Sequence, residues 1–313
     1  MPLERIIASE SKAIELLKER LSGFETEEGR LKGLNFKPRP DDIFIVATPK
    51  AGTTWVQQIC HQLRTGGDME FEEISQVVPW IELAQDQGQD LEAEQADHPR
   101  CFKTHCWYDH CPKGAKYIVV VRNPYDVALS FFKFFEGWFF QPGEVPLDAF
   151  VKEFWLARGK PESPMQNASY FHHFLSWWEH RNDENVLWLF FEELTESLSE
   201  RVKRSAEFMG LHCSQQLLEK VTEMSTFEYM KHHDDKFDEK ISKRTRNAAC
   251  GLPRDAGLSS KKVRSGGVGE GTLELSSSLK AAIRHRWHSV ATEATGFPSY
   301  DELRQYFARK HCS

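Results

Sequence analysis

Ile43-Phe-Ile-Val-Ala-Thr-Pro-Lys-Ala-Gly-Thr-Thr-Trp55 is the stretch of sequence that decides the fold. Its first part, Ile43–Ala47, consists of apolar or small residues and predicts a short buried strand. Pro49 and Gly52 then indicate a turn, and the pattern of Trp55–Leu63 indicates a helix. The stretch therefore predicts a strand–loop–helix unit of an α/β protein.

The loop of this unit has the composition of an anion-binding site. Backbone N–H groups at the start of a helix converge on an anion, and Lys50, Thr53 and Thr54 add an ammonium group and two hydroxyl donors. The loop is not a Walker A motif, because Lys50 precedes Gly52 and no Gly-Lys-Ser/Thr occurs here. We predict a phosphate or sulfate site. The alternative is a strand-to-helix turn with an incidental lysine.

The composition of the chain is that of an ordinary globular protein. Its 313 residues are 40% hydrophobic and 28% charged, and one α/β domain of this size is common. The net charge of −7 argues against a nucleic-acid partner, and no apolar run is long enough to predict a membrane span. Residues 1–23 show no signal-peptide pattern, and the seven cysteines have no framework spacing. We expect reduced thiols and a cytoplasmic location.

The first residues predict an extension of the domain. Apolar residues recur among charged ones over Leu3–Leu21, which predicts an amphipathic surface helix. Residues 22–42 are rich in glycine and proline and predict a loop. We therefore expect residues 1–34 to be a helical extension packed on a domain formed by residues 35–313.

A second strand is predicted at Cys101–Thr104, and it places two reactive side chains together. Lys103 and His105 are two residues apart, so they share a face near the carboxyl end of the strand, where ligands of open α/β sheets bind. A satisfied structural histidine is the alternative. A zinc site is a weaker alternative, because no ligand spacing matches the usual pairs in the group Cys101, His105, Cys106, His110 and Cys111.

A third strand and helix predict a second anion contact. Lys116–Arg122 contains the clearest buried strand, and Pro124–Phe134 continues as a helix. Arg122 can bind a phosphate through two N–H groups, and Ser130 can donate to the same group. A salt bridge from Arg122 to Asp126 is the alternative.

Seven motifs in register resemble the cytosolic sulfotransferase family over about residues 35–300. They are Thr48-Pro-Lys-Ala-Gly-Thr-Thr-Trp55, Lys103-Thr-His105, Val121-Arg-Asn-Pro-Tyr-Asp-Val-Ala-Leu-Ser130, Ser176-Trp-Trp-Glu179, Asn185-Val-Leu-Trp-Leu-Phe190, Thr226-Phe-Glu-Tyr-Met230 and Arg264-Ser-Gly-Gly-Val-Gly269. The resemblance implies a single α/β domain with a central parallel sheet flanked by helices and a P-loop-like phosphosulfate site. It also implies sulfonate transfer from 3′-phosphoadenosine 5′-phosphosulfate (PAPS) to a small-molecule acceptor.

The resemblance further implies the roles of individual residues. His105 would be the general base, with Lys50, Lys103 and Ser130 as further catalytic residues and no metal required. The cofactor-binding residues would be Lys50, Ala51, Gly52, Thr53, Thr54, Trp55, Arg122, Ser130, Phe191, Ser225, Thr226, Phe227, Met230, Arg264, Ser265 and Gly266. Within this set, Arg122 and Ser130 would hold the 3′-phosphate, and Trp55 and Phe227 would stack on the adenine.

The chain departs from the family pattern at several positions. Ala51 stands where a serine is usual, Phe191 where a tyrosine is usual, and Ser265 where a lysine is usual. Gly271 replaces a tryptophan, and the usual dimer segment is unrecognisable in Thr272–Ser278. These changes affect the expected nucleotide affinity and predict a monomer or a weak homodimer.

Residues 231–271 predict a mobile lid. Residues 231–264 hold ten Lys or Arg against five Asp or Glu, which is an excess of five positive charges. A solvated charged loop is the alternative for most of them. We expect Lys261, Lys262 and Arg264 to face a polyanionic cofactor, because they lead into the glycine-rich turn 265–271.

The acceptor pocket is the least determined part of the sequence. Aromatic side chains of 131–140 and Trp80 are candidates, and we expect Trp80, Phe139 and Phe140 to bind the acceptor. They favour a phenol, a steroid or another apolar alcohol, whereas Glu82 and Asp86 would favour an amine. An ATP-dependent phosphotransferase and a non-catalytic adenosine-bisphosphate-binding relative are the rival functions.

Overall fold

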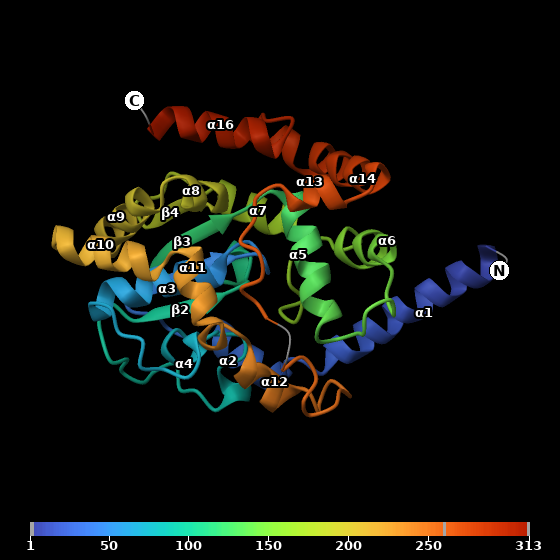
Figure 1. Cartoon of the computed structure of the whole chain (residues 1–313), viewed down its shortest axis with the longest axis horizontal. Coiled ribbons are helices and arrows are strands. Elements are labelled where there is room, and N and C mark those ends of the chain that lie inside the picture. The colour runs from blue at the N-terminus through green and yellow to red at the C-terminus, as the bar shows by residue number, and fades with distance from the viewer. Residues whose placement is uncertain (1–2, 259–260, 312–313) are drawn as a thin grey trace.

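A four-stranded parallel sheet forms the centre of the molecule, shown in Figure 1 as a computed structural model that describes residues 3–258 and 261–311. Its strands are β1 (Ile43–Ala47), β2 (Cys101–Thr104), β3 (Lys116–Val121) and β4 (Val186–Phe190), in the order β2-β1-β3-β4. Every pairing is parallel. The predicted fold class, an α/β domain with a parallel sheet, is confirmed.

The strands form where buried apolar runs were predicted. All residues of β1 and β2 are buried, as parallel strands require when helices cover both faces. The strand predictions for Ile43–Ala47 and Cys101–Thr104 are confirmed. Strand β3 ends at Val121 instead of Arg122, and the arginine turns out of the sheet.

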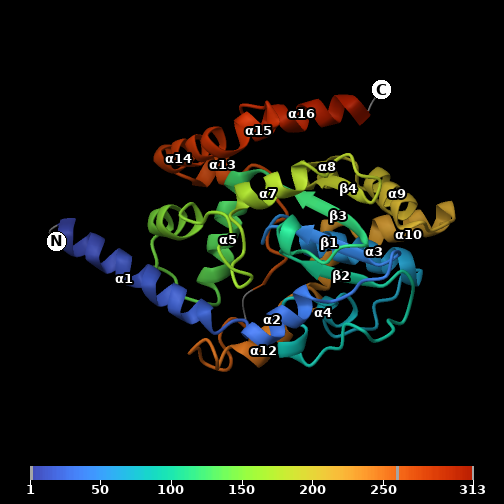
Figure 2. The same cartoon turned by 180° about the vertical axis from the view of Figure 1, so that it is seen from behind.

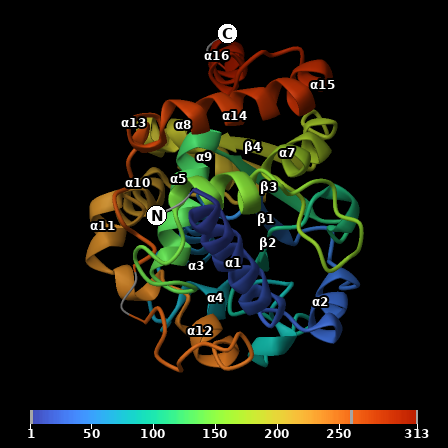
Figure 3. The ribbon, with the colours of Figure 1, turned by 90° about the vertical axis from the view of Figure 1, so that its right-hand side faces the viewer.

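Helices surround the sheet and carry its connections. Figure 3 shows α14 (Ser277–Trp287) and α16 (Tyr300–His311) beyond β4, and it shows α12 (Lys240–Arg246) and α2 (Glu27–Leu34) on the side of β2. The helices after α1 and α2 are α3 (Thr53–Thr65), α4 (Ile74–Val77), α5 (Pro124–Glu136), α6 (Leu147–Ala149), α7 (Tyr170–Trp178), α8 (Phe191–Glu196), α9 (Leu198–Met209), α10 (Gln215–Met224), α11 (Phe227–His232), α12 (Lys240–Arg246), α13 (Glu270–Glu274), α14 (Ser277–Trp287), α15 (Glu293–Thr295) and α16 (Tyr300–His311). The predicted helices over 55–63 and 124–134 lie within α3 and α5.

The N-terminal region confirms one prediction and corrects another. Helix α1 (Leu3–Ser22) forms as expected, and its first half projects from the body in Figures 1 and 2. The predicted loop over 22–42 is wrong, because it contains α2 (Glu27–Leu34), capped by the Thr26 hydroxyl. Gly33, which suggested a turn, allows close packing instead: a Cβ there would lie 2.0 Å from the Ile81 carbonyl oxygen.

No helix in the described part of the chain combines the length and the apolar character that crossing a bilayer requires. The described chain instead shares one extended core. Residues of all four strands belong to a single buried apolar cluster that also includes side chains of α3, α5 and α7. Ile14 and Leu17 of α1 join it, so the second half of that helix packs on the domain.

A buried ion pair fixes the start of two strands and gives a stability prediction. Arg100 donates from Nε and Nη2 to the Asp42 carboxylate at 2.9 and 2.6 Å, and both side chains are 1% exposed. Asp42→Ala should lower the free energy of unfolding by about 3–5 kcal/mol, because it leaves a buried guanidinium without its counter-ion. Urea denaturation measures this change.

The exposed pair between Arg39 and Glu94 provides the matched control. Glu94→Ala should leave the urea midpoint nearly unchanged, because solvent screens that pair. Equal shifts for the two variants would contradict the importance of the buried pair.

Candidate active site

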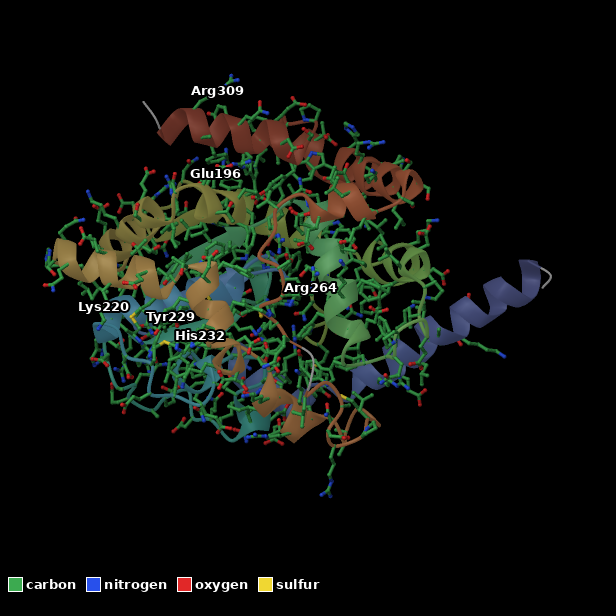
Figure 4. The ribbon with its side chains drawn as sticks, viewed as in Figure 1. Glu196, Lys220, Tyr229, His232, Arg264 and Arg309 are labelled. Carbon is green, nitrogen blue, oxygen red and sulfur yellow. The ribbon has the colours of Figure 1, made fainter. Side chains whose placement is uncertain are left out.

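One cavity of about 1080 Å³ opens where the strands of the sheet end. Its walls come from the loop after β1, the ends of β2 and β3, helix α5 and the coil 261–266. Arg264, labelled in Figure 4, lies on this coil, which passes between α11 and α5. The position agrees with the rule that open α/β sheets bind ligands at the carboxyl ends of their strands.

The loop after β1 presents donors to this cavity. Lys50 has a positive φ of 73°, and its Nζ lies 4.1 Å from the centre of the Phe134 ring. Burial lowers the pKa of Lys50 well below its usual value, and Lys262 and Arg122 lower it further. Gly52 has a φ of 112°, and a Cβ there would lie 2.7 Å from Phe191, so glycine is required.

The loop also contains a hydroxyl suited to a ligand. Thr54 Oγ1 is buried and accepts or donates no hydrogen bond within the described structure. Thr53 and Trp55 line the cavity beside it, whereas the Ala51 side chain lies in the core and does not line it. The loop residues predicted from the sequence therefore lie together, with Ala51 acting as packing.

His105 is held in one tautomer. Its Nδ1 lies 2.6 Å from the Ala47 carbonyl oxygen, which can only accept, so Nδ1 carries the proton and Nε2 is left with its lone pair. The backbone N–H of His105 donates to Glu82 Oε1 at 2.7 Å. Burial and then the charge of Lys103 lower the pKa of His105 well below 6.5. The ring is neutral at neutral pH and can accept a proton.

Lys103 lies beside His105 in the same cavity, as the spacing on β2 predicts. Its Nζ donates to Glu239 Oε1 at 3.1 Å and lies 3.8 Å from the centre of the Trp80 ring. Burial lowers the pKa of Lys103 to about 8, against the raising effect of Glu239. No local sequence pattern pointed to Glu239, which is 136 residues away along the chain.

Arg122 bridges the Lys50 loop and the glycine-rich turn. Its Nη2 donates to the Gly267 carbonyl at 2.8 Å, and its guanidinium lies 3.9 Å from the centre of the Phe191 ring. The Arg122 Nε is buried and has no hydrogen-bond partner within the described residues. Ser130, on α5, lines the same cavity.

Asp126 plays a different part from the one that the salt-bridge alternative gives it. The closest Arg122 nitrogen lies 3.9 Å from its carboxylate, at the limit of an ion pair. Its two oxygens accept from the backbone N–H groups of Gly269 and Gly271 at 2.9 and 2.7 Å. A Cβ at Gly271 would lie 2.2 Å from the Tyr125 carbonyl carbon, so the tryptophan usual in the family does not fit here.

Aromatic residues gather at the end of the cavity assigned to adenine. Trp55 Nε1 donates to the Ser225 carbonyl at 2.7 Å, and the rings of Trp55 and Phe191 meet edge to face at 5.3 Å. Phe227 and Met230 line the cavity. A Cβ at Gly266 would lie 2.4 Å from Phe227, so the turn packs directly on that ring.

Two residues predicted for this end have other positions. Thr226 does not line the cavity, because its hydroxyl caps α11 by accepting from the Tyr229 N–H. Ser225 does not line it either, although its Oγ is buried and without a partner among the described residues. Ser265 and Arg264 both line the cavity.

The acceptor end is aromatic, and one predicted residue is not part of it. Trp80 and Phe139 line the cavity. The prediction for Phe140 is corrected, because this residue is 2% exposed and lies in the core. Its ring centre lies 5.6 Å from that of Phe132 and 6.2 Å from that of Phe150. The helical spacing of the aromatic run could not separate Phe139 from its neighbour.

Sequence reasoning missed Phe24, which follows α1. Its ring lies 5.5 Å from Trp138, 5.9 Å from Trp80 and 5.9 Å from Phe139, so the N-terminal region forms part of the acceptor wall. The acids suspected of binding an amine lie elsewhere. Glu82 accepts from the His105 N–H, and Asp86 accepts from Thr26.

The segment 231–271, predicted to be a lid, begins at the end of α11 and contains a short 3₁₀ turn (Asp234–Lys236) and α12 before the glycine-rich coil. Its three expected cations do line the cavity, but each is paired with an acid of the same segment. The pairs are Lys261 with Asp234 at 2.8 Å, Lys262 with Glu239, and Arg264 with Glu270 at 2.7 Å. Opening of the segment stays a prediction.

The cysteines and histidines around β2 are dispersed. Cys101, Cys106 and Cys111 are buried free thiols. In the described ranges 3–258 and 261–311, no group of three or more His, Cys, Asp or Glu side chains could hold a metal ion.

A parallel sheet with a strand-end cavity that brings together the Lys50 loop, Lys103 and His105 is compatible with a nucleotide-dependent transferase. A family model for the sulfotransferase domain matches residues 40–289, and the chain belongs to this family. Human sulfotransferase 1E1 is 30% identical over 208 residues, which cover 63% of this chain and 69% of that protein. The predicted family and enzyme class are therefore confirmed.

Two solved structures share the fold. Mouse sulfotransferase SULT7A1, solved as a complex with PAP, superposes with a TM-score of 0.62 and 25% identity and covers 85% of this chain and 90% of its own. Retinol dehydratase, in complex with androsterone and the inactive cofactor PAP, has a TM-score of 0.67 and 18% identity. The superposition covers 90% of this chain and 95% of that chain.

Proposed function

We propose that this enzyme transfers the sulfonate of PAPS to a hydroxyl group of a small, largely apolar acceptor, with His105 as the general base. The observation that carries the proposal is the meeting of the Lys50 loop, Arg122 and the free Nε2 side of His105 in one cavity. The PAP complex of the mouse relative supports the choice of cofactor. The family assignment favours sulfonate transfer over ATP-dependent phosphoryl transfer.

The residues present fit a polyanionic adenosine nucleotide. Two cavity-lining residues each have a buried polar atom without a partner in the described structure, namely Thr54 Oγ1 and Arg122 Nε. Buried polar groups are normally hydrogen-bonded, so such atoms suit a ligand. The Lys50 loop would hold the 5′-phosphosulfate, Arg122 and Ser130 the 3′-phosphate with Arg264 and Gly266, and Trp55 and Phe227 the adenine.

The chain's own groups would then perform the proton and charge steps. His105 Nε2 would accept the proton of the acceptor hydroxyl, while its Nδ1–H stays on the Ala47 carbonyl and keeps the ring oriented. Lys50 and Lys103 would stabilise negative charge at the reacting centre, because fixed cations in a dry site need no reorganisation. The bound cofactor supplies an activated sulfonate, so the reaction needs no further activating group.

The walls of the acceptor end favour an aromatic or steroidal alcohol. Phe24, Trp80, Trp138 and Phe139 give an apolar enclosure, and Glu82 and Asp86, which would have favoured an amine, are engaged elsewhere. Arg158 also lines the cavity, with its guanidinium 4.2 Å from the centre of the Phe154 ring, and no acid among the described residues shifts its pKa. Acceptors that carry an anionic group therefore belong in the test.

Three further features stay predictions. They are the cytoplasmic location, the monomeric or weakly dimeric state, and the division into an extension of 1–34 and a domain of 35–313. Size-exclusion chromatography with light scattering at two protein concentrations measures the oligomeric state.

The test of the proposed function is transfer of radiolabelled sulfonate from PAPS to a panel of acceptors. The panel holds a phenol, a steroid alcohol, an aliphatic alcohol, an aryl amine and a phenol with a carboxylate. We expect labelled product from the hydroxyl acceptors, with release of adenosine 3′,5′-bisphosphate. Tight binding of the bisphosphate with no transfer to any acceptor would instead indicate the non-catalytic relative.

A further inference from the structure

A buried carboxylate lies among the cations of the cavity. Glu239 lies just before α12 and is 5% exposed. Its Oε1 accepts from Lys103 at 3.1 Å and from Lys262, and its Oε2 accepts from the Ser242 hydroxyl at 3.0 Å. The acid thus contacts a lysine at the reacting centre and a lysine of the coil that crosses the cavity.

A buried carboxylate is unexpected in a cavity that would bind a polyanion. A cavity for a polyanion gains affinity from unpaired cations, and a buried acid beside them repels the ligand. A carboxylate also loses its hydration when buried and is retained where it has well-placed partners. Glu239 has three such partners, so its position is defined by the surrounding structure.

The electrostatic effect of Glu239 falls on Lys103. Burial alone favours the neutral amine, and a neighbouring anion opposes this. The pKa of Lys103 is lowered to about 8 by burial, and it would be lower without the charge of Glu239. Burial raises the pKa of Glu239 itself, but Lys103 and Lys262 more than offset this and hold it well below its usual range. The two groups therefore keep each other charged.

Other charged groups also interact with this pair, and Glu239 raises the pKa of Lys50 and of Lys243 against the effect of burial. Lys262 lowers the pKa of Lys103, and Glu82 raises it. Lys103 in turn acts on His105 and on Lys50, and lowers the pKa of both. Burial and the charge of Glu239 raise the pKa of Glu73 to about 7, and Glu73 accepts from the Ile241 N–H.

We propose that Glu239 is a positioning residue of the transfer reaction, an internal counter-ion that keeps Lys103 protonated and directed at the reacting centre and that ties Lys262 and its coil to β2. The proposal rests on the proposed function, because its catalytic consequence needs Lys103 to act on the transferring group. Only the ammonium form of Lys103 has a positive charge to stabilise that group. The geometric part of the proposal stands without turnover.

The first experiment measures the Lys103 side chain directly in the enzyme without substrates. Lysine labelled with ¹³C at Cε is titrated by NMR, and the Lys103 resonance is assigned with the variant Lys103→Arg. In Glu239→Gln, the pKa of Lys103 should fall by about 1–3 units, as expected for loss of an opposite charge in contact. In Lys262→Met it should rise, because Lys262 acts in the opposite direction.

The second experiment measures kcat/KM between pH 6 and 9 with the best acceptor. If Lys103 must be protonated for activity, kcat/KM of Glu239→Gln should begin to fall at a lower pH than in the wild type, because the pKa of Lys103 is lower in this variant. Activity should then fall about 5- to 500-fold at pH 8 but no more than about tenfold at pH 6, for a fall of the pKa by about 1–3 units. Glu239→Asp, which keeps the charge, should retain most of the wild-type profile. A variant that has merely lost its packing would be impaired equally at every pH.

Asp234→Asn is the matched control, because Asp234 also pairs with a lysine of the same coil but does not contact Lys103. It should leave the Lys103 pKa where it is. An unchanged Lys103 pKa in Glu239→Gln overturns the proposal, as does equal movement in the control. A shifted pKa in an enzyme that transfers no sulfonate supports the ion-pair assignment and counts against the proposed function alone.

Discussion

His105→Ala is expected to lower kcat about 10²- to 10⁴-fold, the usual contribution of a general base. The reason is geometric: the Nδ1–H of His105 is fixed on the Ala47 carbonyl at 2.6 Å, which leaves Nε2 to receive the acceptor's proton. Initial rates with saturating PAPS and a phenol measure the change. Calorimetric titration with adenosine 3′,5′-bisphosphate should give nearly the wild-type Kd, because the imidazole is not assigned to the nucleotide.

His110→Ala is the matched control for this variant. His110 follows in the same connection but does not line the cavity, so the same substitution there should leave kcat close to wild type. A wild-type kcat in His105→Ala would remove the base assignment. Equal losses in both variants would point to the fold of the connection instead.

The wild-type pH profile checks the same assignment. The pKa of His105 is held well below 6.5, so its base form is present throughout the neutral range. The rate should therefore decline only as the pH falls well below 6.5. The pKa of Lys103 is about 8, so kcat/KM should fall again as the pH rises through this value and the ammonium group loses its proton.

Arg122→Ala is expected to have the largest effect on nucleotide affinity. The guanidinium is largely enclosed between the Phe191 ring and the Gly267 carbonyl, and its Nε has no partner in the described structure. Loss of a buried, hydrogen-bonded charge contact weakens binding by about 2–5 kcal/mol, which is about 30- to 5,000-fold in Kd. Calorimetry with adenosine 3′,5′-bisphosphate measures this loss.

Adenosine 5′-phosphosulfate, which lacks the 3′-phosphate, separates the assigned contact from a general disturbance. Its Kd should change far less in Arg122→Ala, because the arginine is assigned to the missing group. Arg122→Lys keeps the charge without the two-pronged donor geometry and should recover part of the affinity. Equal losses for both nucleotides would show that the arginine is assigned to the wrong phosphate.

The sequence predicted the features that depend on neighbouring residues. The apolar run Ile43–Ala47 and the turn at Pro49 and Gly52 predicted β1 and its loop, because strand burial and helix starts are encoded locally. The spacing of Lys103 and His105 on β2 placed both in the cavity for the same reason. Motif order then identified the family.

The sequence did not predict contacts between distant segments. Phe24 reaches the acceptor end and Glu239 reaches Lys103 through tertiary packing, and no local pattern around either residue indicates its partner. Helix α2 was missed because Gly29 and Gly33, which suggested a loop, instead allow two segments to pack closely. Phe140 was misplaced because neighbours in an aromatic run differ in direction only once the backbone is known.

The end of β3 and the first turn of α5 hold the glycine-rich turn at two points, through side chains four residues apart. Arg122 donates a hydrogen bond to the Gly267 carbonyl, and the Asp126 carboxylate accepts from the amides of Gly269 and Gly271 at the start of α13. These contacts connect both the nucleotide pocket and the C-terminal helices to the start of α5. Deuterium uptake at the amides of Gly269 and Gly271 therefore reports on how stably the nucleotide pocket is held and occupied.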